Sequence, residues 1–181
     1  MRALLVAAIL GGLALGAPPL GAQTAAMATP VAATSQVEPT LGPETNLPLP
    51  RFVSLKTARG EARRGPSRSH RLDWVYTQRG LPLRVTGEFE HWRRVEDVEG
   101  QGGWVHYGQL SGVRTVLVTQ DMEPMRGRPQ ANAPEIAYLE AGVVARIVEC
   151  HRDWCRLNAD GLRGWVSRTA LWGLAPDEML D

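Results

Sequence analysis

The sequence predicts an all-β fold built from two consecutive copies of one small unit. One observation is an internal repeat, since the stretch 142–166 matches the stretch 80–105, about sixty residues earlier. A second is that apolar and polar residues alternate in short runs punctuated by Gly and Pro, as in strands joined by tight turns. A third is that no long window shows a helical period. Short strands of this kind favour a closed or half-closed barrel for each copy, because a barrel buries the strand edges.

Each copy is expected to contain a series of short strands. In the first copy we place them at 52–57, 72–77, 83–88, 92–98 and 103–106. In the second copy we place them at 115–119, 136–139, 143–150, 154–158 and 164–167. Glycines in the intervening loops supply the positive φ that tight hairpins require.

Tryptophans mark equivalent places in the two copies. Trp104 and Trp165 each follow a Gly and precede a Val, like a strand leaving a tight turn, so we expect both to be buried core anchors. Trp92 and Trp154 begin strands directly after their turns. One edge of each of these two indoles is therefore expected to remain open at the rim of its barrel.

The N-terminus resembles a secretory signal over residues 1–22. Arg2 supplies a short positive end and 3–15 is an apolar run, with cleavage expected after Ala22 or, alternatively, after Ala26. The apolar run is shorter than the roughly twenty residues that a membrane-spanning helix needs. We therefore expect a periplasmic or secreted protein with no integral membrane segment after signal removal.

The segment that follows, 23–50, is rich in Ala, Thr and Pro and poor in charge. Such a segment buries too little apolar surface to offset the entropy of ordering it, so we expect a disordered linker. A proline-rich ligand for a partner is the alternative. The two domains are then placed at 51–112 and 113–174, with a C-terminal tail at 175–181.

The two cysteines are predicted to form a disulfide. Cys150 and Cys155 flank the turn 151–154, which places them opposite each other on the two strands of one hairpin. The first copy has Glu88 and Arg93 at these positions, where an ion pair could fasten the same turn. A disulfide also fits export into an oxidising compartment.

The repeated motifs resemble those of a bacterial Src-homology-3-like (SH3-like) domain. In the first copy they are Ala62-Arg63-Arg64-Gly65-Pro66-Ser67, Trp92, Gly103-Trp104-Val105 and Leu110. In the second copy they are Met125-Arg126-Gly127-Arg128-Pro129-Gln130, Trp154, Gly164-Trp165-Val166 and Leu171. The second copy departs from the first by having Arg128 where the first has Gly65. The exported tandem arrangement is similar to a proteobacterial family of SH3-like proteins, and the resemblance covers 52–173.

This resemblance implies two tandem SH3-like barrels that act as a binding module. It implies peptidoglycan or an envelope protein as the partner, and no cofactor. The alternative is a structural or regulatory subunit of an envelope complex with no ligand site of its own. Two copies on one chain would raise avidity towards a repeating polymer.

We find no pattern that predicts an enzyme. The four histidines, His70, His91, His106 and His151, lack metal-ligand spacing, and no paired C-x-x-C set is present. There is no phosphate-binding loop and no constrained carboxylate pair. A disulfide would also remove the thiolate that a Cys-His nucleophile needs. We therefore expect no catalysis, no metal and no cofactor.

Charge leaves one surface open to two interpretations. The formal net charge of +1 argues against nucleic acid as a partner. Locally, however, basic residues gather in the first copy, opposed only by Glu61: Lys56, Arg59, Arg63, Arg64, Arg68 and Arg71. This cluster is either an anion site or a solvated face.

Aromatic residues suggest where a ligand would bind. Indoles and phenols at the rim of a small barrel form a stacking surface with free N–H and O–H groups, although they could equally close the barrel ends. The ligand-binding candidates are Trp92, Trp154, Tyr76, Tyr107, Tyr138, Arg63 and Arg64.

Overall fold

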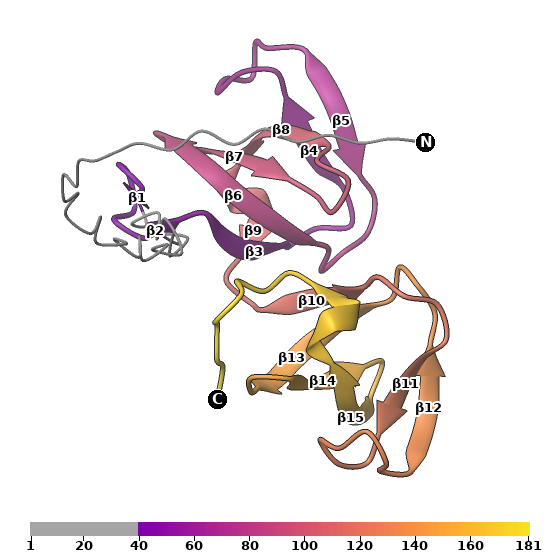
Figure 1. Cartoon of the computed structure of the whole chain (residues 1–181). Helices are drawn as coiled ribbons and strands as arrows, with labels where there is room; N and C mark the ends of the chain where they lie inside the picture. The colour runs from indigo at the N-terminus through magenta and orange to yellow at the C-terminus, as the bar shows by residue number, and fades with distance from the viewer. Residues whose placement is uncertain (1–39) are drawn as a thin grey trace, which may run out of the picture. The chain divides into compact units, whose positions relative to one another are not determined.

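A computed structural model describes residues 40–181 (Figure 1). The predicted signal, 1–22, and the part 23–39 of the predicted linker lie outside the described residues. The described chain consists of β-strands, turns and two short 3₁₀ helices, which confirms the all-β prediction. Within the same residues no helix is long and apolar enough to cross a membrane.

The first copy forms an antiparallel sheet in the order β5-β4-β8-β7-β6-β3-β9. Its elements are β3 (Arg51–Leu55), β4 (Gly60–Arg63), β5 (Leu72–Tyr76), β6 (Pro82–Phe89), β7 (Trp92–Glu96), β8 (Gly102–His106), the 3₁₀ helix η1 (Tyr107–Gln109) and β9 (Leu110–Ser111). Consecutive strands β6, β7 and β8 are neighbours, whereas β3 and β4 lie on opposite sides of them. The sheet coils around its own core (Figure 1).

The second copy repeats this arrangement in the order β12-β11-β15-β14-β13-β10-β16. Its elements are β10 (Thr115–Val118), β11 (Glu123–Arg126), β12 (Glu135–Leu139), β13 (Val144–Cys150), β14 (Trp154–Ala159), β15 (Leu162–Ser167), η2 (Arg168–Ala170) and β16 (Leu171–Trp172). Registers also correspond, since Arg63 lies opposite Trp104 and Arg126 lies opposite Trp165. The sequence repeat is thus a repeat of topology.

Strand alternation explains which residues form the two cores. The buried residues of the first core are Leu55, Ala62, Tyr76, Leu83, Val85, Val95 and Val105. Those of the second core are Val116, Val118, Met125, Leu139, Ala145, Ile147, Cys150, Cys155, Leu157, Ala159 and Val166. Successive side chains of a strand point to opposite faces, so the outward positions remain free for polar contacts.

The same alternation corrects the prediction for two tryptophans. Val105 and Val166 point into the cores, so their neighbours Trp104 and Trp165 face outward and are only half-buried. They hold equivalent positions, as predicted, but they are not core anchors. Trp92, which was expected to be open, is 8% exposed.

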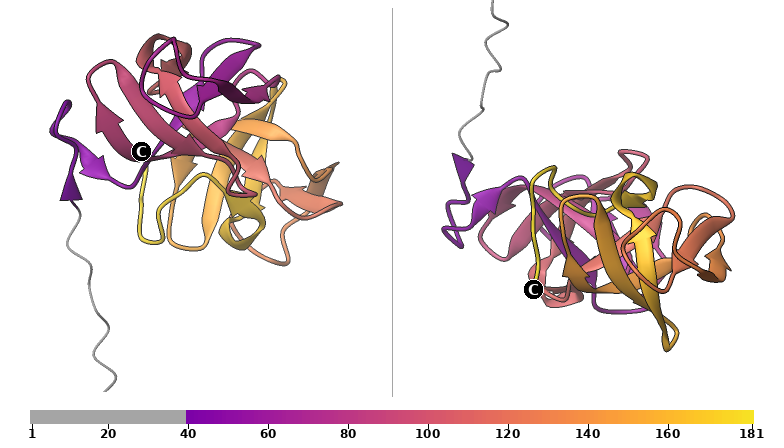
Figure 2. Two further views of the ribbon diagram at one scale, coloured as in Figure 1. Left: turned by 90° about the horizontal axis from the view of Figure 1, so that it is seen from above. Right: turned by 60° about the horizontal axis from the view of Figure 1, so that its bottom comes forward.

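Residues 40–50, which the sequence assigns to a disordered linker, are structured. Strands β1 (Thr40–Leu41) and β2 (Pro48–Leu49) pair as a hairpin, which projects at one side of the first domain in Figure 2. The turn of the hairpin packs against the side chain of Glu88, near the end of β6. Structured residues therefore extend upstream of the predicted boundary at residue 51.

Glu88 is the anchor of this hairpin, and its side chain is fully buried. Its carboxylate accepts hydrogen bonds from the backbone N–H groups of Glu44 and Thr45, both at 3.0 Å, and from the Thr45 hydroxyl at 2.7 Å. It also pairs with the guanidinium of Arg51 at 2.6 Å and with Arg93 at 3.4 Å. Burial alone raises the pKa of Glu88, but these hydrogen bonds outweigh it and lower the pKa to about 2.

The equivalent turn of the second domain is held by a disulfide. Cys150 and Cys155 face each other across β13 and β14, and the structure joins them with an S–S distance of 2.05 Å. Glu88 and Arg93 face each other in the same way across β6 and β7, and their ion pair confirms the predicted contact. A terminal segment covers this turn too, because the backbone of Leu180 bonds to that of Cys150.

Candidate ligand site

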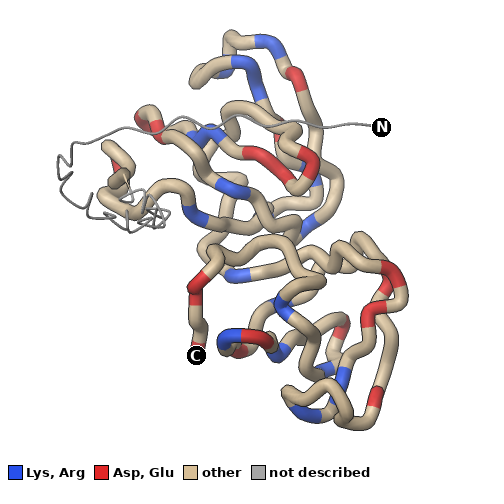
Figure 3. Tube along the Cα trace, viewed as in Figure 1, with Lys and Arg blue, Asp and Glu red and all other residues tan. Residues whose placement is uncertain are grey.

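Four of the six residues of the predicted basic cluster are engaged in ion pairs within the fold, and they share two carboxylates. The pairs are Arg59 with Glu61 (3.8 Å), Arg63 with Glu61 (2.7 Å), Arg64 with Asp73 (3.0 Å) and Arg71 with Asp73 (2.7 Å). Hydrogen bonds from Arg64 and then from Arg71 lower the pKa of Asp73. Basic and acidic positions both occur along the trace of the first domain (Figure 3). Within residues 40–181, Lys56 and Arg68 have no acidic partner.

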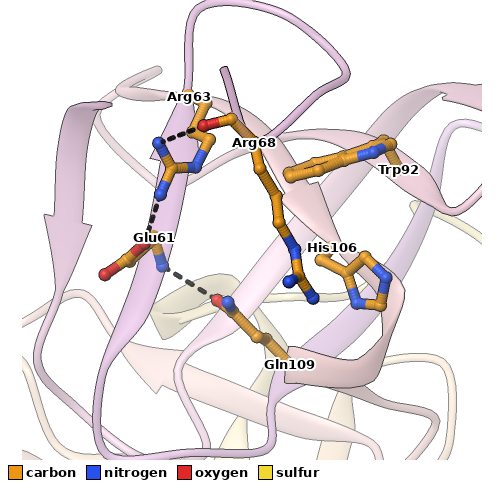
Figure 4. Close-up of a pocket in the computed structure, with 6 residues that line it drawn as sticks. All are labelled: Glu61, Arg63, Arg68, Trp92, His106 and Gln109. Carbon is orange, nitrogen blue, oxygen red and sulfur yellow. Dashed lines mark hydrogen bonds and ion pairs between the residues drawn. The ribbon is translucent and has the colours of Figure 1, made fainter. Parts of the chain in front are cut away.

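A pocket of about 280 Å³ lies beside the unpaired Arg68 (Figure 4). Its lining residues come from β4, the loop after it, β7, β8 and η1, and they are Glu61, Arg63, Arg68, Trp92, His106 and Gln109. Figure 4 shows the Arg68 guanidinium between the Gln109 amide and the His106 ring, with the Trp92 indole beside them. The pocket therefore combines a cation, neutral polar groups and an aromatic wall.

The loop that carries Arg68 is fixed by its own hydrogen bonds. The Arg63 guanidinium donates to the backbone carbonyl of Arg68 at 3.2 Å and to that of His70 at 2.9 Å. The hydroxyls of Ser67 and Ser69 share a hydrogen bond at 2.6 Å. A loop held at both its stem and its tip has little backbone entropy left to lose on binding.

His106 lines the pocket, and a hydrogen bond to one ring nitrogen fixes its tautomer. Its Nδ1 accepts a hydrogen bond from the Gly108 backbone N–H at 3.2 Å, so the proton of the neutral ring is on Nε2. Burial lowers the pKa of His106, and the charges of Arg68, His91 and Arg93 lower it further. Its ring contacts Trp92 edge to face, with centroids 5.5 Å apart.

An exposed aromatic group extends this wall to the surface. Tyr107 is 52% exposed, and its ring centroid lies 4.8 Å from that of His106 and 5.6 Å from that of His91. The Trp92 indole, the His106 ring and the Tyr107 ring thus lead from the buried interior to solvent. A ligand with an apolar part would find a continuous aromatic surface here.

The family of the chain follows from a comparison with known domains. A family profile described as bacterial SH3 domain matches residues 56–112 and 119–173, together more than half of the chain. The chain belongs to the bacterial SH3 domain family. The pocket described above lies in the first of its two SH3 domains, and the disulfide lies in the second.

Solved structures resemble this tandem SH3 protein only distantly. NlpC2 from Trichomonas vaginalis is 16% identical, over 68% of this chain and 48% of that chain, with a TM-score of 0.31. NlpC1 from the same organism is 15% identical, over 72% and 48%, with a TM-score of 0.32. The chain spans about half the length of these two proteins, and a likeness at this level says nothing about its activity. No curated protein matches the sequence.

The first SH3 domain brings together some of the predicted ligand residues. Trp92 and Arg63 both line the pocket, and the Tyr107 ring lies next to that of His106, which lines it too. Arg64 is exposed and bound to Asp73, so it is not part of the pocket. Tyr76 is not an exposed aromatic residue, because it lies in the core at 3% exposure and its hydroxyl donates to the Gln101 carbonyl at 2.8 Å.

The remaining two candidates belong to the second SH3 domain. Trp154 is half-buried at the start of β14, and Tyr138 is 53% exposed on β12, where its hydroxyl bonds to Glu135. Neither residue lines the pocket of the first domain.

Sequence reasoning missed His106 and Gln109 as site residues, and it gave Arg68 no individual role. His106 was considered only as a metal ligand or as the base of a Cys-His pair. A usable signal was present in the repeat itself, since His106 aligns with Ser167 and Gln109 aligns with Ala170. Polar groups found in one copy and not in the other are candidates for function, because the shared fold does not need them.

Proposed function

We propose that this tandem SH3 protein is an exported, non-catalytic module that binds peptidoglycan. The observation that carries the proposal is the pocket of the first SH3 domain. Arg68 reaches this pocket from a preorganised loop, and His106 and Trp92 line it as well. Arg68 and His106 offer donors that no residue of the described chain accepts, and Trp92 adds an apolar wall. An envelope protein is the alternative partner for the same surface.

Export and the absence of catalysis are supported from separate directions. The sequence of 1–22 resembles a secretory signal, and disulfides such as Cys150–Cys155 persist in oxidising compartments. Because these two cysteines are bonded to each other, neither supplies a thiolate nucleophile. Among residues 40–181, no group of three or more acidic, His or Cys side chains is placed to hold a metal ion.

Sedimentation with purified peptidoglycan sacculi tests this proposal. The mature chain should pellet with sacculi at low salt and, to a smaller extent, at moderate salt, because charge contacts on an exposed surface are screened. Tyr107→Ala should lower the bound fraction, whereas Tyr138→Ala, which removes an equally exposed phenol from the second domain, should lower it less. If the folded wild-type chain stays in the supernatant at both salt concentrations, wall binding is wrong. Cross-linking in envelope extracts would then be used to find a protein partner.

A further inference from the structure

The pocket of the first SH3 domain presents hydrogen-bond donors and few free acceptors. The Arg68 guanidinium has no acidic partner in the described part of the chain, and His106 presents its Nε2–H. Gln109 uses its side-chain oxygen to accept from the Glu61 backbone N–H at 2.9 Å, which leaves its amide nitrogen for the pocket. Three donors that converge on one small cavity favour a ligand that only accepts hydrogen bonds.

The charge of the lining residues favours an anion that carries a single negative charge. Glu61 is the acidic residue of the pocket, and its carboxylate is already paired with Arg63 at 2.7 Å. Among the lining residues Glu61 offsets Arg63, so the charge of Arg68 gives the lining one net positive charge. A ligand with two negative charges would also be repelled by Glu61, so a single negative charge fits better. A planar carboxylate further matches the forked donors of a guanidinium.

The aromatic wall describes the rest of the ligand. Trp92, which is 8% exposed, and the half-buried His106 ring flank the donors with apolar surface. A cavity of about 280 Å³ holds a small end group and not a long segment. These features fit a carboxylate attached to a small apolar group, as at the C-terminus of a peptide that ends in a small residue.

The second SH3 domain provides an internal comparison. Its equivalent loop is built in the same way, because Arg126 donates to the Ala133 carbonyl at 2.9 Å just as Arg63 donates to that of His70. The three donors, however, are missing from it. Ala131, Ser167 and Ala170 stand in the places of Arg68, His106 and Gln109.

The second domain also supplies a carboxylate of its own near this place. Glu123 is 8% exposed and occupies the position of Gly60 in the first domain. Burial raises the pKa of Glu123, while a hydrogen bond from the Ser167 backbone and the charge of Arg126 act in the opposite direction. In the second domain, Arg126 and Ser167 stand in the places of Arg63 and His106 and lie near an internal carboxylate. In the first domain, Arg63 and His106 line an open pocket instead.

We infer that the pocket of the first SH3 domain binds the carboxylate of a peptide C-terminus, with Arg68 as the charge partner and His106 and Gln109 as neutral donors. This inference deepens the proposed function, since such a carboxylate could come from the peptides of peptidoglycan or from the C-terminus of a protein. The second domain lacks the donors and does not bind this group.

A titration with two matched peptides tests the inference on the mature chain. The probes are N-acetyl-trialanine as the free acid and as the C-terminal amide, followed by NMR through the amide and indole N–H signals. The acid should shift signals of Trp92, His106 and the loop around Arg68, and it should bind at least tenfold more tightly than the amide. Arg68→Gln should reduce the affinity for the acid by about tenfold or more, because a hydrogen bond to a charged group is lost. Arg68→Lys should recover part of it.

The control variant is Arg128→Gln, which removes one exposed charge from the equivalent loop of the second domain. It should leave the affinity unchanged. Far-UV circular dichroism and thermal unfolding confirm that each variant is folded, which is expected because Arg68 is exposed and its side chain pairs with no acidic group of the described chain. Equal binding of acid and amide, an unchanged affinity in Arg68→Gln, or no shifts in the pocket at the highest peptide concentration would each overturn the inference.

Sedimentation of the same variants separates the two sources of the carboxylate. If Arg68→Gln no longer pellets with sacculi, the wall supplies the ligand. If the acid peptide binds in the pocket while the wild-type chain ignores sacculi, the pocket inference stands and the wall proposal fails. If sacculi bind wild type and Arg68→Gln equally, the wall proposal stands and the pocket is not its site.

Discussion

Replacing Glu88 by Gln should destabilise the first SH3 domain strongly at neutral pH and little in acid. Gln keeps the size of the side chain but removes the charge that the N–H groups of the hairpin and two arginines surround. The pKa of Glu88 is about 2 in the folded chain, against an ordinary 4.5. That difference corresponds to about 3 kcal/mol of folding free energy.

The sign of the pH dependence follows from the lowered pKa. The contribution of Glu88 is fully present above its unfolded pKa, near 4.5, and it is lost as the pH falls towards 2. The wild-type and Glu88→Gln chains should therefore differ by about 3 kcal/mol at pH 7 and should converge as the pH approaches 2. A loss of this size is also usual when one partner is removed from a buried ion pair.

Native-state hydrogen exchange gives the measurement, because it reports on each SH3 domain separately. Protection of the core amides of Val85 and Val95 should fall in Glu88→Gln, while that of Val166 stays unchanged. Glu96→Gln is the matched control, since Glu96 pairs with an exposed Arg84 and should contribute less than about 1 kcal/mol. Equal stability of wild type and Glu88→Gln at pH 7, or a difference that stays constant down to pH 2.5, would refute the reasoning.

Three further predictions concern the second domain, the tryptophans and the C-terminal tail. Reduction of Cys150–Cys155 should destabilise the second domain by about 2 kcal/mol, the value for a short loop on the chain-entropy model, and mass spectrometry of alkylated protein should find no free thiol before reduction. Trp92→Ala should cost about 3 to 5 kcal/mol in chemical unfolding, and the half-buried Trp165→Ala clearly less, so an equal cost would contradict the burial described. The Arg114 guanidinium bonds to the Gly173 carbonyl and to Glu178, so Arg114→Ala should loosen the C-terminal tail. Limited proteolysis should then remove the tail before either domain is cut. A tail as resistant to protease as that of the wild type would exclude this role.

The repeat could be predicted from the sequence, because equivalent residues mark the same strands and turns in both copies. Gly80 and Gly142 were aligned from their spacing, and both adopt a positive φ, at 80° and 87°. The opposition of Glu88 and Arg93 was predicted from the place of the two cysteines in the other copy. Local pattern and hairpin geometry determine these features, so a single sequence is enough to infer them.

The burial of individual side chains at the barrel rims could not be predicted from the sequence, because it depends on which strands are neighbours in the sheet. Trp104 follows a turn in the same way whether its ring points inward or outward, and only the register of β8 decides between the two. The pocket was missed for the same reason, since Arg68 and His106 are distant in sequence and meet only through the β4–β8 pairing. The hairpin at 40–50 was missed because its stability comes from Glu88, not from its own composition.

The two fastenings of the equivalent turns respond to different chemical conditions. In the first SH3 domain the turn is held by the Glu88–Arg93 ion pair, which is lost in acid and is unaffected by thiols. In the second SH3 domain the turn is held by the Cys150–Cys155 disulfide, which is stable in acid and is broken by a reductant. Acid and reducing agents therefore loosen different halves of the same protein, and only a medium that is both acidic and reducing weakens both at once.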